Sequence, residues 1–251
     1  MDKISGVNSE TGASGALKEH VALITGGSRG IGKAIGLKLA ELGAAVCICG
    51  REAKALQEAA AEIRKVSGRA LALRGDVTHA GEIAEVVRQT EERLGAISVL
   101  VNNAGIGNPG FGAMQEKSES DWDAVVDTNL KGVFLMSRAV APLMIARKGG
   151  DIINISSLAG KNTFAGGSLY CASKWGLQGL SGCMAEDLRG YGIRVSVICP
   201  GSVATEFSGR GAKDATKVLT AEDVAHAVAM VVQQGPQSFI SEVHLRPVGR
   251  K

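Results

Sequence analysis

Tyr170 and Lys174 stand four residues apart in a segment with helical spacing. Side chains at this spacing share one helical face, with Cβ atoms roughly 5–6 Å apart. A phenol has an ordinary pKa of about 10, so it exchanges protons near neutral pH only if its surroundings lower that pKa. An ammonium about 4 Å away supplies about 4 kcal/mol at an effective dielectric constant of roughly 20, which is about the interaction required. The pair therefore predicts acid–base chemistry at a substrate oxygen, although a Tyr and a Lys on a helix can also be a core ring and a surface charge.

Two further polar residues fit the same chemistry. Ser157 follows the apolar run Asp151–Ile155, so its hydroxyl is expected at the carboxyl end of a strand, where it can polarise a carbonyl group. Asn129 lies in a long segment that is otherwise apolar at helical spacing. A buried amide needs hydrogen-bond partners, and a proton-relay water is one candidate.

A glycine-rich turn near the start of the chain predicts a nucleotide site. An apolar run ends at Ile24 and is followed by Thr25-Gly26-Gly27-Ser28-Arg29-Gly30-Ile31-Gly32 at the opening of a helical pattern. Glycine lets the backbone approach a pyrophosphate, and a helix N-terminus offers free N–H groups and the positive end of its dipole. The order strand, turn, helix makes this signal more specific than a glycine-rich loop alone.

Two arginines favour NADP(H) over NAD(H). The second apolar run ends in Cys49-Gly50-Arg51, where an NAD site would carry an Asp or Glu for the ribose hydroxyls. Arg51, together with Arg29 in the glycine turn, can pair with a 2′-phosphate that a carboxylate would repel. The alternative is that Arg51 is only a solvated charge at the start of a helix.

The elements that must position these residues alternate along the chain. Seven short apolar runs are predicted strands: Val21–Ile24, Ala45–Cys49, Ala70–Leu73, Ser98–Val101, Asp151–Ile155, Val195–Ile198 and Glu242–Leu245. Six longer segments are predicted helices: Ile31–Leu42, Ala53–Val66, Ile83–Leu94, Asp121–Arg147 (capped by Ser120), Leu169–Arg189 and Glu222–Gln234 (capped by Thr220). Unalternated apolar strands separated by helices predict an α/β fold, a doubly wound seven-stranded parallel sheet with helices on both faces.

Composition narrows the possible functions. The chain has 251 residues with a net charge of +3 and shows no run of basic residues, so no nucleic-acid or membrane-surface partner is expected. Residues 1–18 lack the apolar core of a signal peptide and are predicted to be a flexible leader. Residues 19–251 are predicted to form a single dinucleotide-binding catalytic domain. No hydrophobic stretch is expected to reach the length of a membrane span. Five cysteines without Cys-x-x-Cys spacing fit a reducing cytoplasm.

From about His20 to about Pro247, the sequence closely resembles the compact short-chain dehydrogenase/reductases. In general layout it is similar to the 3-oxoacyl-[acyl-carrier-protein] reductases of that family. The resemblance rests on the glycine turn, Asp76-Val77, Asn102-Asn103-Ala104-Gly105, Asn129, Ser157, Tyr170, Lys174 and Pro200-Gly201. It implies hydride transfer between nicotinamide and a carbonyl or secondary alcohol, with no metal needed. One departure is the ending Glu242-Val243-His244-Leu245-Arg246-Pro247, where many relatives have an acidic Gly-Gly tail.

The resemblance implies a role for each matching residue. Tyr170 would exchange the proton, Ser157 orient the carbonyl, Lys174 bind the nicotinamide ribose while lowering the tyrosine pKa, and Asn129 hold the water chain. The implied cofactor-binding residues are Gly26, Ser28, Arg29, Gly30, Ile31, Gly32, Arg51, Asp76, Val77, Asn103, Ala104, Gly105, Tyr170, Lys174, Pro200, Gly201, Val203 and Thr205. Turn chemistry alone could also explain Asp76 and Asn102.

The substrate is expected to be a small-molecule carbonyl or alcohol, and the chain is expected to form a homo-oligomer, a tetramer or dimer. The predicted substrate walls are Leu158, Phe164, Phe111, Met114 and the stretch Ser202–Leu219. Two other functions remain open. One is a redox sensor or regulatory protein that binds NADP(H) without turning it over, and the other is a sugar-nucleotide epimerase or dehydratase, for which the chain leaves little room.

Overall fold

The protein is described by a computed structural model that covers residues 15–107, 112–205, 207 and 217–249. Seven parallel strands form one sheet in the order β3-β2-β1-β4-β5-β6-β7. The strands are β1 (Val21–Thr25), β2 (Ala45–Gly50), β3 (Ala70–Arg74), β4 (Ile97–Asn102), β5 (Gly150–Ile155), β6 (Ile193–Pro200) and β7 (Glu242–Leu245). The predicted doubly wound sheet is confirmed, and each predicted strand lies within two residues of the observed one.

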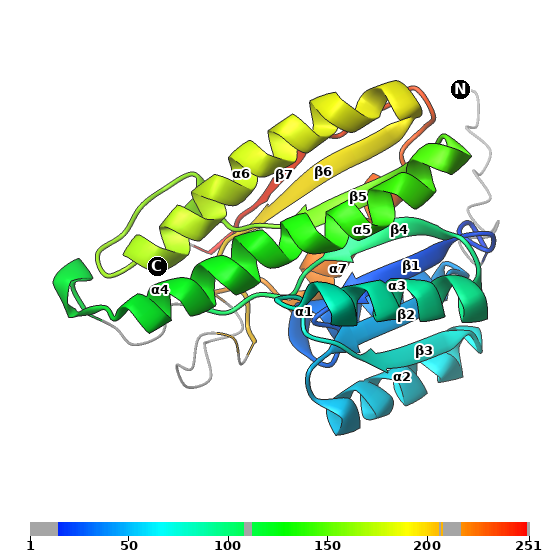
Figure 1. Ribbon diagram of the computed structural model, residues 1–251, viewed down its shortest axis with the longest axis horizontal. Helices are drawn as coiled ribbons and strands as arrows, with labels where there is room; N and C mark the ends of the chain where they lie inside the picture. Colours follow the sequence, from blue (N-terminus) through cyan, green and yellow to red (C-terminus); the bar gives the residue numbers. More distant parts are fainter. Residues whose placement is uncertain (1–14, 108–111, 206, 208–216, 250–251) are drawn as a thin grey trace, which may run out of the picture.

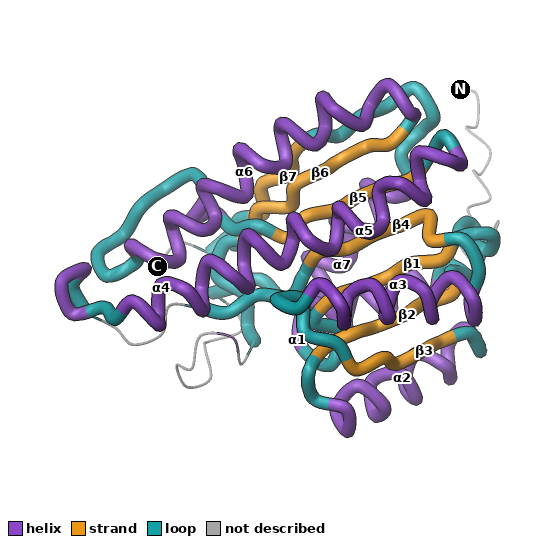
Figure 2. Tube along the Cα trace, in the orientation of Figure 1, coloured by secondary structure: helices purple, strands orange, loops and turns teal. Residues whose placement is uncertain are grey.

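Helices cover both faces of the sheet, as Figures 1 and 2 show. The helices are α1 (Gly30–Glu41), α2 (Ala53–Ser67), α3 (Ala80–Leu94), α4 (Glu119–Val126), α5 (Gly132–Arg147), α6 (Ser168–Leu188) and α7 (Ala221–Val232). One buried apolar cluster joins α1, α2 and α7 to the sheet, and a second joins α3, α5 and α6 to the opposite face. This double cover explains why strands such as Ala45–Gly50 are apolar at successive positions.

The strand order reverses between β1 and β4, which are neighbours in the sheet although β2 and β3 lie between them in the chain. The chain leaves β1 toward one side and β4 toward the other, so the carboxyl ends of these strands face a crevice. This topological switch point lies between the glycine turn after β1 and the polar segment after β4.

The long predicted helix Asp121–Arg147 is interrupted. A wider π-helical turn, Asp127–Lys131, joins α4 to α5 and contains the buried Asn129. The helix begins earlier than predicted, because Ser118 rather than Ser120 caps it by accepting a hydrogen bond from the backbone N–H of Asp121. Thr220 caps α7 as predicted.

The combined helical run Glu119–Arg147 is long and apolar enough, by length and composition alone, to cross a membrane. The sequence expectation concerned uninterrupted apolar stretches, and Lys131 and Arg138 interrupt this run. In the structure the run lies along the fold, with α5 packed on β4 and α3, and α4 packed on α6. Packing against the sheet and the neighbouring helices therefore explains part of the apolar character of this run.

The first described residues differ from the predicted leader. Gly15–Glu19 form a turn against the end of α1, where the backbone N–H of Leu17 donates to the carbonyl of Leu42 at 2.8 Å. The Leu17 side chain is buried in the same cluster as α1 and α7. Residues 15–18 are therefore part of the domain, and residues 1–14 lie outside the described part of the chain.

Candidate active site at the carboxyl edge of the sheet

The glycine turn is a close backbone cradle between β1 and α1. Gly26 has a φ of +65°, and a Cβ atom placed on it would lie 2.9 Å from Cα of Ala104. A Cβ on Gly32 would lie 2.3 Å from the carbonyl oxygen of Gly26 and 2.5 Å from Nδ2 of Asn103. Both positions therefore require glycine for steric reasons, and Gly26 also for its backbone conformation.

The polar segment after β4 holds this turn in place. The Asn103 amide nitrogen donates to the carbonyls of Thr25 and Gly26, at 2.9 and 3.1 Å. The Thr25 hydroxyl in turn accepts from the backbone N–H groups of Asn103 and Ala104. Asn103 was predicted to lie along the ribose, and in the structure its side chain braces the cradle across the switch point.

The start of α1 has an unusual backbone geometry. Arg29 precedes the helix in an extended conformation, and Gly30 has a φ of +53°. The first N–H groups of a helix have no partner within the helix and can bind an anion. In α1 these groups include the backbone N–H groups of Ile31 and Gly32. Thr205 approaches from the loop after β6, where its methyl group would lie 3.4 Å from a Cβ on Gly30. The predicted Gly26–Gly32 and Thr205 residues thus meet at one place.

Arg51 follows β2 and Asp76 lies two residues after β3, and the positive charge of Arg51 acts on the Asp76 carboxylate. The Asp76 carboxylate accepts hydrogen bonds from the backbone N–H and the hydroxyl of Thr78, at 2.9 and 2.8 Å. Partial burial opposes ionisation, but the Thr78 hydrogen bonds and the Arg51 charge outweigh it and lower the pKa of Asp76. Asp76 therefore has the turn role that the sequence left open. Val77 beside it is buried against Gly132 at the start of α5.

Tyr170, Lys174 and Ser157 come together at the carboxyl end of β5. The Lys174 ammonium is buried and donates to the carbonyl of Ile155 at 2.9 Å, and it lies 5.7 Å from the centroid of the Tyr170 ring. The Ser157 side chain lies close enough to the Tyr170 phenol to act on its pKa, and the Ser157 hydroxyl accepts from the Ala159 backbone N–H at 3.1 Å. The predicted shared face of Tyr170 and Lys174 is therefore present.

The protonation of this group differs from the prediction. Burial raises the pKa of Tyr170 to about 12, even though the Ser157 hydrogen bond acts in the opposite direction. Burial also lowers the pKa of Lys174 to about 8. The predicted lowering of the phenol pKa by Lys174 is not seen in the folded chain, where burial of the phenol is the largest influence on its pKa. At neutral pH the phenol is a hydrogen-bond donor that carries its proton.

The Lys174 pKa predicts a pH dependence of stability. From about pH 8 to about pH 10.5 the folded chain releases the lysine proton while the unfolded chain keeps it, so the free energy of unfolding rises with pH. The desolvation cost is fully present below about pH 8. Relative to Lys174→Met, the wild type should therefore gain about 2 kcal/mol between about pH 7.5 and about pH 9.5, measured by urea unfolding. The matched control is Met in place of the exposed Lys54. If the difference in unfolding free energy between wild type and variant does not change with pH for either variant, burial of a titrating amine is contradicted.

Asn129 braces the site from the π-helical turn. Its side-chain oxygen accepts from the Ile106 backbone N–H at 2.8 Å, and its amide donates to the Ile106 carbonyl at 3.0 Å and to the Ser173 hydroxyl at 3.2 Å. The Ser173 hydroxyl donates to the carbonyl of Tyr170 at 2.8 Å. The amide therefore links the segment after Gly105 to the helix turn that carries Tyr170. Its predicted role in a water chain stays a prediction.

The loop after β6 closes the other side of the crevice. Pro200 ends β6, and the Gly201 backbone N–H donates to the Leu245 carbonyl at 2.8 Å. Val203 is buried and pairs with Leu219, and the Phe207 ring centroid lies 6.1 Å from that of Tyr170. The loop thus runs from the end of the sheet toward both Gly30 and Tyr170.

The predicted substrate walls are only partly described. Leu158 adjoins Gly201, where a Cβ would lie 3.3 Å from the leucine methyl carbon, and the Phe164 and Met114 side chains are exposed. Phe111 and much of the stretch Ser202–Leu219 lie outside the described residues.

Several polar residues in and beneath the site were given no catalytic or binding role from the sequence. Ser173 connects Asn129 to Tyr170, and the Gln178 amide donates to the Ser156 hydroxyl at 3.0 Å beside Ser157. Beneath the site, a buried chain of hydrogen bonds joins four further side chains: Ser137, Asn102, Asn154 and Ser181. A signal existed for Asn102 and Asn154, since both are amides inside apolar strands and therefore require partners.

Comparisons with known proteins agree with this architecture. The sequence model described as short chain dehydrogenase matches residues 20–216. The chain is 38% identical over 229 residues to a 3-oxoacyl-[acyl-carrier-protein] reductase of Synechocystis sp., an alignment that covers 91% of this chain and 89% of that relative.

Two solved structures share the fold over nearly the whole chain. A metagenomic short-chain oxidoreductase in complex with NADP is 42% identical, with a TM-score of 0.83 and coverage of 94% of this chain and 100% of the other. An alcohol dehydrogenase from the archaeon Thermococcus sibiricus, complexed with 5-hydroxy-NADP, is 28% identical, with a TM-score of 0.86 and coverage of 92% and 98%. By sequence model, fold and relatives alike, the chain belongs to the short-chain dehydrogenase/reductase family of oxidoreductases.

Proposed function

We propose that the protein is an NADP(H)-dependent carbonyl reductase, and equally a secondary-alcohol dehydrogenase in the reverse direction. The observation that carries the proposal is the meeting of the Tyr170 phenol and the Ser157 hydroxyl beside the buried Lys174 ammonium, at the carboxyl end of β5. Two hydroxyls converging on one point suit a carbonyl oxygen, which accepts two hydrogen bonds.

The chain's own residues fit a dinucleotide. The close packing at Gly26 and Gly32 holds the backbone of the turn at the start of α1, where a pyrophosphate would lie against its N–H groups. Gly26–Gly32 would hold the pyrophosphate, Asp76 and Val77 would lie by the adenine, and Ala104 and Gly105 would line the nearer ribose. Pro200, Gly201, Val203 and Thr205 would surround the nicotinamide end. When bound, the reduced cofactor supplies a hydride to the carbonyl carbon.

The proton comes from the protein. Tyr170, with its pKa raised to about 12, holds its proton at neutral pH and donates a hydrogen bond to the substrate oxygen. As charge develops on that oxygen, the proton moves from the phenol to it, while Ser157 orients the carbonyl. The Lys174 ammonium stabilises the phenolate that remains, and its pKa of about 8 lets it exchange protons near neutral pH. Asn129 positions Tyr170 through Ser173.

The preference for NADP(H) rests on Arg51. Arg51 is exposed at the end of β2, where no acidic residue follows the strand directly, and its charge lies close enough to Asp76 to lower the pKa of that carboxyl. A guanidinium here pairs with a 2′-phosphate, and Arg29 in the glycine turn adds a second positive charge. Two similar solved structures hold NADP or a derivative of it.

Arg51→Ala should reduce this preference. We expect wild-type protein to bind NADPH at least about tenfold more tightly than NADH, which requires about 1.4 kcal/mol and is within reach of one charged contact. The variant should lose most of that ratio through weaker NADPH binding, with NADH binding little changed, in a fluorescence titration of both cofactors. Exposed Arg189, replaced by Ala, is the control. An unchanged ratio in Arg51→Ala would show that Arg51 is only a surface charge.

The substrate class is a small ketone or a 3-oxoacyl compound. The experiment is an assay of NADPH oxidation against a panel of aliphatic ketones, aromatic ketones and 3-oxoacyl thioesters. Turnover of at least one member is the expected result. Tight NADPH binding with no turnover on the whole panel would favour the alternative of a redox sensor that binds NADP(H) without chemistry.

We also propose that the chain forms a homo-oligomer in the cytoplasm. Large apolar side chains are exposed on three helices of one layer: Trp122 on α4, Phe134 on α5 and Trp175 on α6. A second copy of the chain would cover them and remove apolar area from water. Light scattering should therefore give a mass at least twice that of one chain, and the mass of a single chain would contradict the proposal.

A further inference from the structure

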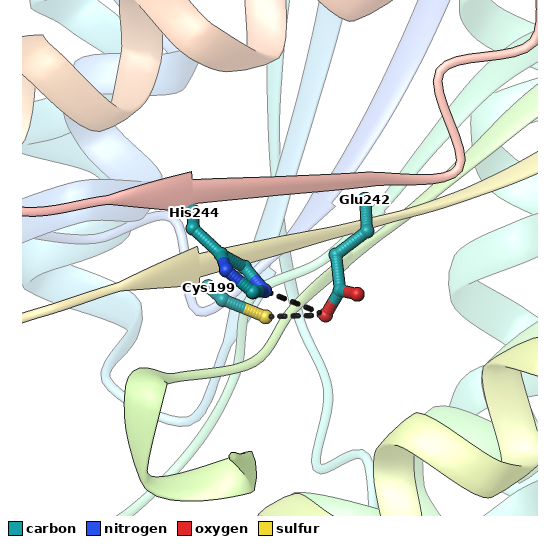
Figure 3. A group of neighbouring side chains, drawn as sticks. All are labelled: Cys199, Glu242 and His244. Atoms are coloured by element: carbon teal, nitrogen blue, oxygen red, sulfur yellow. Dashed lines mark hydrogen bonds and ion pairs between the residues drawn. The ribbon is translucent and has the colours of Figure 1, made fainter. Parts of the chain in front are cut away.

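A cysteine, a glutamate and a histidine meet at the β7 edge of the sheet, joined to the proposed active site through Gln178, whose amide donates to both Ser156 and Cys199. Figure 3 shows Cys199 on β6 and Glu242 and His244 on β7, with their side chains turned toward one another. The register explains the meeting, because Cys199 pairs with His244 across the parallel ladder. Glu242 lies two residues before His244 and so points to the same face of the sheet.

The ligand atoms have nearly the spacing of a metal site. The Cys199 sulfur lies 3.3 Å from the Glu242 oxygen Oε1, and Nε2 of His244 lies 3.1 Å from the same oxygen. All three ligand atoms lie within 4.8 Å of one another. In a tetrahedral zinc site with bond lengths of about 2.0–2.3 Å, neighbouring ligand atoms are about 3.3–3.6 Å apart. The two spacings to the Glu242 oxygen are therefore close to those of a zinc site, and the Cys199 sulfur and the His244 nitrogen, within 4.8 Å of each other, would approach to admit an ion.

We propose that Cys199, Glu242 and His244 form a binding site for a single Zn²⁺ ion. Thiolate, imidazole and carboxylate are all zinc ligands, whereas Mg²⁺ and Ca²⁺ prefer oxygen ligands alone. Three protein ligands leave the fourth tetrahedral position to water. Cys199 is fully buried, while the Glu242 and His244 side chains are 31% and 43% exposed, so an ion can enter from the solvent side.

Binding has a defined charge balance. The Cys199 thiol donates to Glu242 in the ion-free structure, and its proton leaves to solvent when sulfur becomes a thiolate ligand. The Gln178 amide already donates to this sulfur at 3.2 Å and would stabilise the thiolate. The Lys161 ammonium pairs with Oε1 of Glu242 at 2.9 Å and would give up that position to the ion. This pair is partly exposed, so its loss opposes binding only weakly.

The ion would tie the edge of the sheet to its neighbour. β7 is a four-residue edge strand whose Leu245 carbonyl accepts from Gly201, where the loop toward Gly30 and Tyr170 begins. Cross-linking Cys199 of β6 to two residues of β7 would fix this strand and the start of that loop. The inference does not depend on the proposed reductase activity.

The test is zinc binding to the full-length chain after treatment with a chelator. We expect one ZnCl₂ equivalent to bind per chain by calorimetry, raise the unfolding temperature and release protons in buffers of different ionisation enthalpy. Cys199→Ser and His244→Gln should each weaken zinc binding by at least about tenfold. Replacing a residue that only hydrogen-bonds to a metal ligand already costs about 10–100-fold in metal affinity. Exposed Cys183→Ser and His226→Gln are the matched controls and should bind like wild type.

Cobalt spectroscopy of the wild-type protein tests the proposal even if a ligand variant misfolds. Wild-type protein with CoCl₂ should show a thiolate-to-cobalt charge-transfer band and the intense visible bands of tetrahedral cobalt, which addition of ZnCl₂ should remove. No saturable zinc binding, no thiolate band, or a thiolate band that Cys199→Ser retains in folded protein would each overturn the proposal. The cluster would then be a hydrogen-bonded group only.

Discussion

Tyr170→Phe should lower kcat for NADPH-dependent ketone reduction by about 10²–10⁴-fold, the usual contribution of a positioned acid or base. The substitution removes the hydroxyl that holds the proton and keeps the ring that lies beside Phe207 and the Lys174 ammonium. The affinity for NADPH should change by less than about threefold, because the glycine cradle and Arg51 are untouched. Steady-state kinetics and a fluorescence titration measure the two quantities.

The only other tyrosine of the chain, Tyr191, gives a matched control. It is 48% exposed, so Tyr191→Phe removes a phenol at a solvated position and should leave kcat unchanged. Equal reduction rates for Tyr170→Phe and the wild type would remove Tyr170 from the chemistry. Ser157→Ala should lie between these two variants, since it removes one of two hydrogen bonds to the carbonyl oxygen.

Gly32→Ala should weaken NADPH binding by at least about tenfold and lower the free energy of unfolding by about 1–3 kcal/mol, the cost of an overpacked site. The new methyl group would lie 2.3 Å from the carbonyl oxygen of Gly26 and 2.5 Å from Nδ2 of Asn103. Neither neighbour can move freely, because Gly26 has a left-handed backbone conformation and Asn103 makes two hydrogen bonds to the turn. The turn must therefore open, which separates the backbone N–H groups that would hold the pyrophosphate.

Gly81→Ala separates this effect from helix propensity. Gly81 lies in α3 with nothing within 4 Å of an added Cβ. In an exposed helix Ala is favoured over Gly by about 1 kcal/mol, so this variant should be slightly more stable and bind NADPH like wild type. Unchanged NADPH affinity in Gly32→Ala would mean that the glycine turn is not the pyrophosphate site.

The sheet was predictable because its burial is uniform. Strands such as β2 are covered on both faces, and successive apolar residues bounded by glycine and charge are typical of that environment. The start of α4 was less certain for a clear reason. Ser118 and Ser120 are each followed three residues later by an acid, Asp121 and Asp123, so both satisfy the capping pattern. Only the structure shows that Ser118 is the cap.

The candidate site was predictable in residue type and less so in contacts. Tyr170, Lys174 and Ser157 were placed together by helical spacing and strand ends. The partners of Asn129 could not be inferred, because Ile106 lies 23 positions away and the hydrogen bonds are to its backbone.

Two properties of the site depend on tertiary packing. The predicted effect of the Lys174 charge on the Tyr170 pKa did not include burial, because burial around the phenol is a property of the packed chain. The Cys199, Glu242 and His244 cluster was also missed, because the metal-ligand spacing arises only from the pairing of β6 with β7.

The most direct test of hydride and proton transfer by this chain uses NADPH carrying deuterium at the transferring carbon of the nicotinamide. Incubation with a ketone from the panel that the protein turns over should give an alcohol with one deuterium on the former carbonyl carbon, detected by mass spectrometry, and an equal amount of NADP⁺. Tyr170→Phe under the same conditions should give about 10²–10⁴-fold less labelled alcohol per unit time. Bound NADPH with no deuterium in any product of the panel would contradict the account, as would equal labelling by wild type and Tyr170→Phe.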